Sequence, residues 1–258
     1  MDSSTRTQNY LSHLEVRVYT GVQRSTPMGL AAPSRKNVTF AHGSRERLTA
    51  RDLGRFPGNT LFDRIGRAVC AAGCLPRKEL YEAWEVARRA RRMFRGGRVV
   101  DLGGGHGLLA HIMLILDDTS PAAIVVDKVH PVCGVTIAQK LATEWPRLSG
   151  RVRRIEADID AVAIEHGDVV VAGHACGRLT DIVLERASEA EARLAVLPCC
   201  HDVAVCDAGD LDGWMDEALA IDAVRALRLR ARGYRVWTQA IPEEITPKNR
   251  LLLAAPHR

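Results

Sequence analysis

The stretch Val99-Val100-Asp101-Leu102-Gly103-Gly104-Gly105-His106-Gly107-Leu108-Leu109-Ala110 decides the fold of this chain. An apolar run ends in an acidic residue, a glycine-rich turn follows, and a second apolar run begins at once. Glycine lets the backbone approach a ligand closely and adopt conformations that other residues avoid. The first turn of a helix also presents unpaired N–H groups. The stretch therefore predicts a strand, a ligand-binding turn and a helix.

Strands and helices alternate on the C-terminal side of this stretch. The predicted strands span 98–102, 122–127, 152–156, 168–173, 193–198, 234–240 and 249–254. The predicted helices span 106–117, 132–145, 179–190 and 211–232. Such alternation favours a parallel sheet with helices on both faces. The last two strands are joined by a loop too short for a parallel crossover, so we expect them to form an antiparallel hairpin.

The chain before the stretch divides into two parts. Residues 1–50 are polar and lack apolar periodicity, which predicts a flexible or arm-like extension. Apolar residues then recur at helical spacing, and we expect residues 51–97 to form a helical cap. The domain that carries the glycine-rich turn is predicted to span 98–258.

Composition and length bound the class of protein. The 258 residues, 47% of them hydrophobic, are typical of one large globular α/β domain with an extension. No apolar run reaches the roughly 18 residues that span a bilayer, and the polar start lacks a secretory signal. We therefore expect a cytoplasmic protein with no membrane partner. The seven cysteines are an odd number without a repeating framework, which predicts reduced thiols.

Charge is spread unevenly along the chain. Residues 1–98 hold 19 Lys/Arg and 8 Asp/Glu, whereas the remainder holds 17 and 23. A basic N-terminal part is compatible with a polyanionic partner, although a solvated face is the more common meaning of such clusters.

The glycine-rich stretch contains D-x-G-x-G-x-G and resembles motif I of the class I S-adenosylmethionine (SAM) methyltransferases. The seven expected strands with a closing hairpin match that Rossmann-like fold. The resemblance implies that the glycine turn holds the methionine end of SAM, that Asp127 accepts from the ribose hydroxyls, and that Asp158 lies near the adenine. Asp158 is equally compatible with a capping role. The expected cofactor-binding residues are Asp101, Gly103, Gly104, Gly105, Gly107, Asp127, Lys128, Asp158, Ile159 and Gly173.

A competing interpretation uses the same residues. Gly105-His106-Gly107-Leu108-Leu109-Ala110 fits G-x-G-x-x-A, the dinucleotide fingerprint, with Asp127 at a suitable ribose distance. This pattern predicts NAD rather than SAM. The position of Asp101 and the closing hairpin favour SAM, and calorimetry with SAM and NAD distinguishes the two.

The ends of the fourth and fifth expected strands carry further motifs. H-A-C-G-x-L-T-D begins at His174, P-C-C-H ends at His201, and T-P-K-N-R spans 246–250. Together they resemble the methyltransferase-like domains related to tRNA acceptor-stem ribose 2′-O-methyltransferases, over about residues 98–255. Because the carboxyl ends of parallel strands border the ligand crevice, we expect these loops to face the transferred methyl.

These loops supply the candidates for catalysis and acceptor binding. His174 is the first candidate general base and His201 the second, and an ordering role is equally compatible with either. Cys176, Cys199 and Cys200 are expected to line the acceptor site. We predict no metal there, because adjacent cysteines do not readily present both sulfurs to one ion and the spacing matches no common zinc module. Lys248, Asn249 and Arg250 are expected to contact the acceptor, or alternatively to pin their own loop.

The sequence thus predicts a SAM-dependent methyltransferase acting on an oxygen or nitrogen nucleophile. A small-molecule acceptor is favoured, since residues 1–95 show no Cys/His zinc-finger module of the kind that the tRNA enzymes usually carry. One alternative is an RNA ribose methyltransferase that uses the basic region 77–98 as a phosphate footprint. Another is a non-catalytic regulator that binds SAM or S-adenosylhomocysteine.

Overall fold

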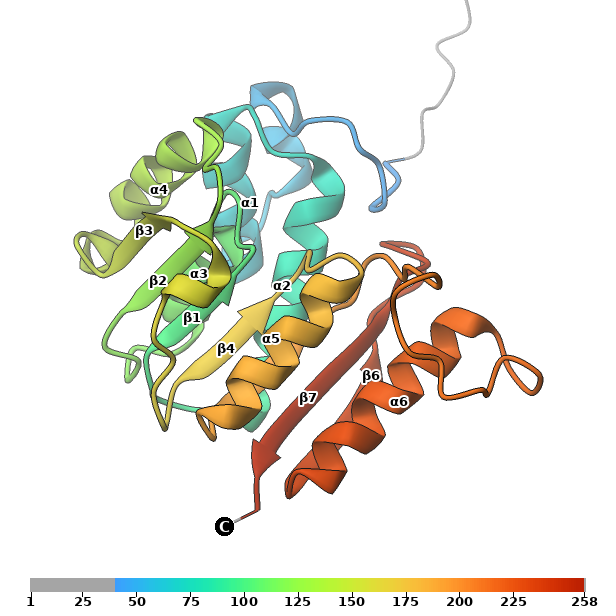
Figure 1. The fold of residues 1–258 in the computed structure, drawn as a ribbon. Helices are drawn as coiled ribbons and strands as arrows, with labels where there is room; N and C mark the ends of the chain where they lie inside the picture. Colours follow the sequence, from blue (N-terminus) through green and yellow to red (C-terminus); the bar gives the residue numbers. More distant parts are fainter. Residues whose placement is uncertain (1–39, 258) are drawn as a thin grey trace, which may run out of the picture. The chain divides into compact units, whose positions relative to one another are not determined.

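The glycine-rich stretch lies at the centre of a seven-stranded sheet, with strand order β3-β2-β1-β4-β5-β7-β6 (Figure 1). The computed structural model describes residues 40–257. The first five strands are parallel, and β7 runs antiparallel to both β5 and β6. The strands are β1 (Val99–Leu102), β2 (Ala123–Asp127), β3 (Val152–Glu156), β4 (Val169–Ala172), β5 (Arg193–Val196), β6 (Tyr234–Ala240) and β7 (Arg250–Pro256). The predicted Rossmann-like α/β sheet with its closing hairpin is confirmed.

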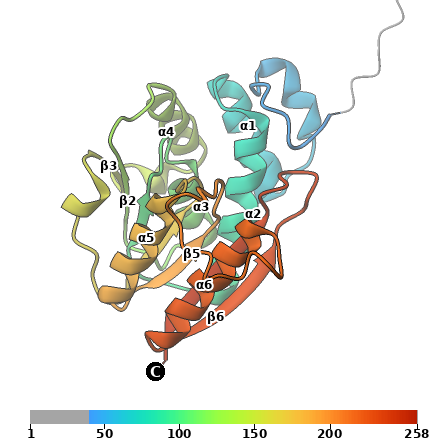
Figure 2. The same ribbon diagram turned by 45° about the vertical axis from the view of Figure 1, so that its right-hand side comes forward.

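Helices cover both faces of this sheet (Figures 1 and 2). They are α1 (Leu61–Ala72), α2 (Arg77–Met93), α3 (Leu108–Leu116), α4 (Cys133–Glu144), α5 (Arg178–Glu189) and α6 (Glu217–Ala231). Short 3-10 helices span Ala50–Arg55, Pro146–Leu148 and Ile159–Ala161. One core cluster joins the sheet to α1–α4, and a second joins it to α5 and α6. The alternation of residues along each strand produces this division, because successive side chains point to opposite faces.

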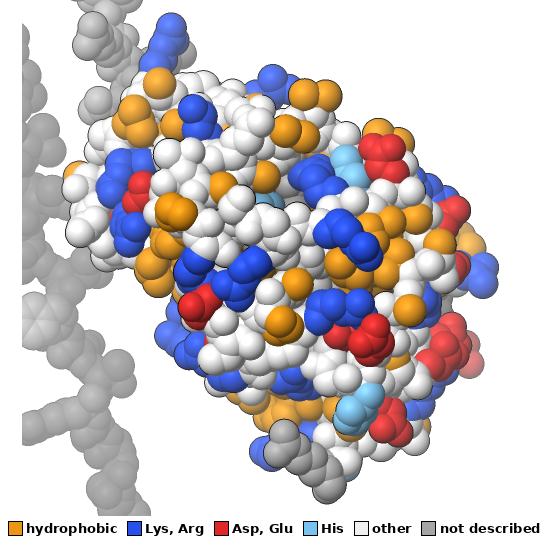
Figure 3. All heavy atoms as spheres, turned by 90° about the vertical axis from the view of Figure 1, so that its left-hand side faces the viewer, with side chains coloured by type: hydrophobic (Ala, Val, Ile, Leu, Met, Phe, Trp, Pro, Cys, Tyr) orange, Lys and Arg blue, Asp and Glu red, His pale blue; other side chains and the backbone are white. Residues whose placement is uncertain are grey.

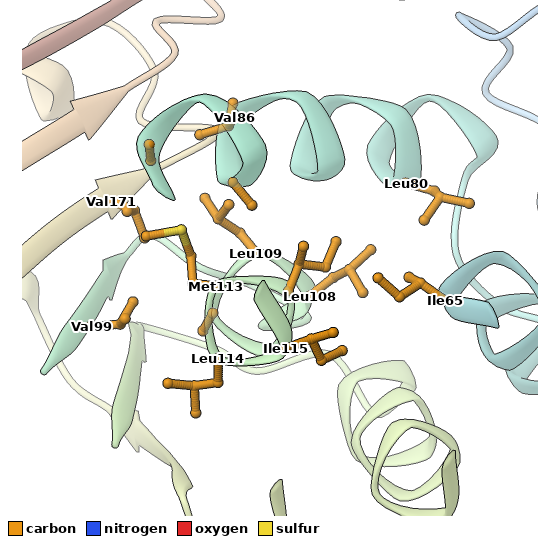
Figure 4. Close-up of a cluster of buried hydrophobic side chains, with 14 of the residues drawn as sticks. Ile65, Leu80, Val86, Val99, Leu108, Leu109, Met113, Leu114, Ile115 and Val171 are labelled. Atoms are coloured by element: carbon orange, nitrogen blue, oxygen red, sulfur yellow. The ribbon is translucent and has the colours of Figure 1, made fainter. Parts of the chain in front are cut away.

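Helix α3 is the most deeply buried of these helices. Its residues 108–115 are all buried, and it packs against both α2 and β1. In Figure 4, Leu109 and Met113 of α3 lie between Val86 of α2 and Val171 of β4. Because α3 begins directly after the glycine turn, this packing fixes the turn against the sheet.

Helix α6 begins later than its apolar pattern predicts. The expected helix starts at residue 211, whereas α6 starts at Glu217. The Asp216 side chain accepts a hydrogen bond from the Leu219 N–H at 3.1 Å and so caps the helix there. The residues between β5 and Asp216 therefore form a long loop.

The segment before β1 is packed against the sheet. Helices α1 and α2 belong to the same core cluster as β1 and β4. Leu48 is fully buried, and its N–H donates to the Leu75 carbonyl at 2.9 Å. Residues 1–39 of the expected extension (1–50) lie outside the described residues. From Leu48 onward the chain is part of the packed structure.

Two cysteines differ from the expectation of reduced thiols. Cys74, just before α2, forms a disulfide with Cys133 at the start of α4, 59 residues later in the chain. No sequence pattern predicts this pairing, because the approach of α1 and α4 is a tertiary contact. Within residues 40–257, no helix is long and apolar enough to cross a membrane.

Candidate functional site

The glycine turn follows β1, at the position in the sheet where the strand order reverses. Strand β1 pairs with β2 on one side and β4 on the other, so the crevice above their carboxyl ends is open to a ligand. Gly103 and Gly105 adopt φ values of 67° and 46°, which only glycine adopts without strain. A Cβ on Gly104 would lie 2.7 Å from Asp101 Cγ and from Val125 Cγ1. The turn therefore needs glycine at these positions.

Asp101 lies beneath the turn as a buried acid. It is 1% exposed, and its Oδ2 accepts from the Ala110 N–H of α3 at 3.3 Å. Its Oδ1 is buried without a hydrogen-bond partner among residues 40–257. Burial raises the pKa of Asp101 to about 7. Asp101 also lines the cavity described below.

Two side chains from neighbouring strands brace the turn. Asp127, at the end of β2, accepts from the Gly105 N–H at 2.9 Å. Arg154, on β3, donates to the carbonyls of His106 at 3.0 Å and Gly105 at 2.9 Å. The guanidinium passes close to Gly134, where a Cβ would lie 2.1 Å from it. Sequence reasoning found Asp127 but missed Arg154, because no motif marks a strand arginine that reaches a distant turn.

A cavity of about 280 Å³ opens beside the turn. Residues from the turn, α2, α3 and the loop after β4 form its walls. They are Leu75, Glu79, Glu82, Ala83, Asp101, Gly103, Gly104, Gly105, His106, Leu108, Leu109, Asp127, Gly173 and His174. The cavity thus brings together seven predicted site residues. Six are predicted cofactor-binding residues, Asp101, Gly103, Gly104, Gly105, Asp127 and Gly173, and the seventh is the candidate base His174.

Helix α2 contributes a second pair of acids that sequence reasoning missed. Glu82 is 2% exposed, and its Oε1 forms an ion pair with Lys78 Nζ at 3.2 Å. Its Oε2 is buried and has no hydrogen-bond partner in the described part of the chain. The sequence carried a signal for it, since Glu82 lies one turn before the buried Val86. An acid on the buried face of a helix needs a partner or a ligand.

Glu79 lies one turn before Glu82 on the same helix. Its Oε2 is 3.1 Å from His106 Nδ1 in the glycine turn. Burial by itself raises the pKa of Glu79, but the hydrogen bond and charge of His106, together with His174 and Lys78, leave this pKa below its usual value. The cavity is therefore lined by four carboxyl groups, which suits a positively charged ligand.

Four of the expected cofactor residues lie elsewhere. Lys128 Nζ and Asp158 Oδ1 form an exposed ion pair at 2.6 Å. Ile159 is buried in the core cluster beneath α5, and Gly107 caps α3 at φ 74°. The described lining of the cavity includes none of these four. The predicted adenine contact of Asp158 stays a prediction.

The loops after β4 and β5 converge as expected. The Sγ atoms of Cys176, Cys199 and Cys200 all lie within 4.8 Å of one another. The Gly177 N–H donates to the Cys200 carbonyl at 3.0 Å and ties the two loops together. Burial raises the pKa of both Cys176 and Cys199. These thiols adjoin His174, which lines the cavity.

His201 and the loop 241–250 make internal contacts. His201 Nε2 lies 2.8 Å from Asp222 Oδ1, and Arg250 Nε donates to Asp222 Oδ2 at 2.7 Å. Asn249 Nδ2 donates to the Ile241 carbonyl at 3.0 Å, so it pins its own loop. Lys248 is exposed. Arg250 thus links the hairpin to α6, and His201 links the loop after β5 to α6. Acceptor contacts by these residues and catalysis by His201 stay predictions.

The residues of the cavity fit SAM. Its sulfonium and ammonium groups are cationic, and two buried carboxylate oxygens, Asp101 Oδ1 and Glu82 Oε2, lack partners among the described residues. The glycines of the turn allow the backbone to approach the ligand. The volume is close to the lower end of that of small-molecule sites.

Comparisons with known proteins agree with the fold. A family model described as a methyltransferase domain matches residues 78–206. No curated protein matches the chain. Among solved structures, an O-methyltransferase family protein from Burkholderia thailandensis is 19% identical with a TM-score of 0.46, and the match covers 80% of this chain and 62% of that one. The ribosomal protein L11 methylase from Lactobacillus delbrueckii subsp. bulgaricus is 16% identical with a TM-score of 0.41, covering 68% and 77%. The tRNA methyltransferase TrmK of B. subtilis is 17% identical with a TM-score of 0.45, covering 69% and 65%.

Proposed function

The chain belongs to the methyltransferase-domain family, whose methyl donor is SAM, and from this premise we propose that it methylates an oxygen or nitrogen nucleophile of a small molecule. One observation carries the proposal: Asp101 and Glu82, which each have a buried carboxylate oxygen without a partner among the described residues, line a cavity beside a glycine turn. SAM supplies an electrophilic methyl group when it is bound there.

The donor is held from three sides in this proposal. The turn 103–105 receives the methionine end, where Glu82 and Asp101 attract its positive charges. Asp127 accepts from the Gly105 N–H through Oδ2 and, at 3.5 Å, from the Val129 N–H through Oδ1, and it is our candidate for accepting from the ribose hydroxyls. Asp158 lies further out, beyond the end of β3, as the candidate for the adenine.

The acceptor enters beside His174 in this proposal. His174 lines the cavity and is about half exposed, with 45% of its side chain accessible. A side chain so placed contacts both the donor site and solvent, and it is our candidate for the group that takes the proton of the nucleophile. Cys176 follows His174 by two residues and clusters with Cys199 and Cys200, which we propose to line the acceptor site, and His201 is the second candidate base.

The environment of the basic region 77–98 supports a small acceptor over RNA. Arg91 is 2% exposed and donates to the Met113 carbonyl and to Ser120 Oγ. Arg88 and Arg89 both pair with Glu85, and Arg98 pairs with Asp168. Arginines engaged in this way release few counterions on binding a polyanion. On the face drawn in Figure 3, which is the β3 and α4 side of Figure 1, basic side chains are interspersed with acidic and apolar ones.

Transfer of tritiated methyl from SAM into fractionated cell extract tests the proposal. We expect label in the small-molecule fraction and none with Asp101→Ala, which lacks the buried carboxylate. Label in RNA, with binding to bulk tRNA that weakens steeply as salt rises, would instead establish the RNA alternative. Tight SAM binding with no label in any fraction would indicate a regulator, and calorimetric binding of NAD but not SAM would overturn the donor assignment.

A further inference from the structure

Three free thiols meet where the loops after β4 and β5 approach each other. Cys176 comes from the first loop, and Cys199 and Cys200 come from the second. Cys176 and Cys199 have Sγ atoms 2.8 Å apart, and all three Sγ atoms lie within 4.8 Å of one another. In a tetrahedral zinc site, thiolate sulfurs are roughly 3.8 Å apart, because each Zn–S bond is about 2.3 Å long. The Cys176–Cys199 separation is shorter than that value, and the 4.8 Å limit on all three pairs leaves room for it.

The local backbone explains how adjacent cysteines contribute to one cluster. In a strand, Cys199 and Cys200 would point to opposite faces. Strand β5 ends at Val196, and both residues lie in irregular loop structure, which frees their side chains from that alternation. The sequence-based prediction of no metal rested on two grounds: adjacent cysteines do not readily present both sulfurs to one ion, and the spacing matches no common zinc module. The loop conformation of Cys199 and Cys200 answers the first ground.

Hydrogen bonds at Gly177 hold the two cysteine loops together. Gly177, next to Cys176, donates its N–H to the Cys200 carbonyl and accepts from Arg225 Nη2, each at 3.0 Å. The Arg225 side chain is 1% exposed and is fixed by its ion pair with Asp181 at 2.8 Å. A site whose ligands are positioned before binding loses less conformational entropy when the ion arrives.

The cluster is also open on its outer side. Cys176 and Cys200 are exposed, and Cys199 is half-buried. Among residues 40–257, no fourth histidine, cysteine or carboxylate joins the group. Three protein ligands with a free fourth position are typical of catalytic rather than structural zinc sites.

We propose that Cys176, Cys199 and Cys200 bind one thiophilic divalent cation, with zinc as the preferred ion. Each thiol gives up its proton to solvent as its sulfur bonds to the metal, so three S–H bonds are exchanged for three S–Zn bonds. The fourth position takes water or an exogenous ligand. Soft thiolate ligands select zinc over magnesium or calcium, which prefer oxygen.

The place of this site relative to the donor cavity suggests its use. Cys176 follows His174 by two residues, so their Cα atoms lie within about 7 Å of each other, and His174 lines the cavity. A thiol or hydroxyl of the acceptor bound at the open position would lose its proton more readily. This use rests on the proposed function, whereas the metal site itself rests on the three thiols alone.

Cobalt provides a direct readout that does not depend on methyl transfer. Reduced, metal-free full-length protein is titrated with Co²⁺ without oxygen, and thiolate-to-cobalt charge-transfer absorption and d–d bands are recorded. We expect one equivalent to bind with tetrahedral-type d–d bands, and one equivalent of Zn²⁺ to displace it. Cys199→Ser and Cys176→Ser, from the two loops, should each weaken binding at least about 100-fold.

Cys70→Ser is the matched control. Cys70 is a buried free cysteine of the described chain that lies in α1, outside the cluster and its supporting contacts, so its loss should leave the cobalt spectrum unchanged. Circular dichroism confirms that each variant is folded, and having one variant from each loop keeps the test decisive if the other is unstable. Absence of the charge-transfer band in reduced wild type, or formation of a Cys176–Cys199 disulfide instead of a metal complex, would overturn the proposal. Failure of methyl transfer with normal cobalt binding would affect only the proposed function.

Discussion

Glu82 and His174 approach each other at one wall of the donor cavity, with Glu82 Oε2 3.8 Å from His174 Nε2. The carboxylate comes from α2 and the imidazole from the loop after β4, 92 positions later. Glu82 Oε1 pairs with Lys78, whereas Oε2, the oxygen near His174, has no hydrogen-bond partner among the described residues. The proposed donor site and the proposed catalytic group therefore adjoin at these two residues.

Glu82→Gln should weaken SAM binding at least about tenfold, because a charged hydrogen bond contributes about 1.5–3 kcal/mol. The dissociation constant is measured by calorimetry. Glu85→Gln is the matched control, since Glu85 is on the same helix but pairs with Arg88 and Arg89 away from the cavity. Equal affinities for wild type and Glu82→Gln would remove Glu82 from the donor site.

His174→Ala should lower kcat by about 100-fold or more, the usual contribution of a positioned acid or base. The dissociation constant of SAM should stay within about twofold of wild type, because the acids of the cavity remain. His166→Ala, at an exposed loop histidine, is the control. An unchanged kcat would exclude His174 from the mechanism.

Asp101 should make stability depend on pH. Burial raises the pKa of Asp101 to about 7, whereas an aspartate in the unfolded chain titrates near about 4. Between these values the folded state holds a proton that the unfolded state has released, so the free energy of unfolding falls as pH rises from about 4 to about 7. Asp101→Asn lacks this dependence.

Urea unfolding at pH 5 and pH 8 measures the effect. Relative to wild type, Asp101→Asn should gain up to about 3 kcal/mol between these two pH values. Asp212→Asn, at an exposed carboxyl, should show no such gain. Parallel pH curves for wild type and Asp101→Asn would show that Asp101 is ionised throughout this range.

Gly104→Ala should destabilise the turn, since its Cβ would lie 2.7 Å from Asp101 Cγ and from Val125 Cγ1. Overpacking of this kind costs about 1–3 kcal/mol, and SAM affinity should fall with it. Gly54→Ala is the control, because a Cβ there has no described atom within 4 Å. The two free energies of unfolding are compared by denaturant titration.

Cys74→Ser should lower the free energy of unfolding by about 4 kcal/mol, the expected contribution of a disulfide that closes a loop of this length. Reductant should destabilise the wild type by a similar amount and leave the variant unchanged. A wild type that is insensitive to reductant would contradict the disulfide.

The sequence by itself determined the layers of the fold and the position of the glycine turn. Strand and helix periodicities are local, because each follows from the direction of side chains along the backbone. The stretch 99–110 therefore predicts a strand, a turn and a helix within twelve residues. The connection before β7 is likewise too short for a parallel crossover, so the sequence predicts an antiparallel hairpin there.

The tertiary structure decided which distant side chains meet. Glu82 and His174, Arg154 and the turn, Cys74 and Cys133, and the three thiols of the two loops are all contacts between separate elements. A sequence pattern describes one element at a time, whereas these distances depend on how α2 and α4 pack on the sheet and on where β5 ends. The donor was therefore readable from one stretch, and the acceptor side depended on packing that no single stretch encodes.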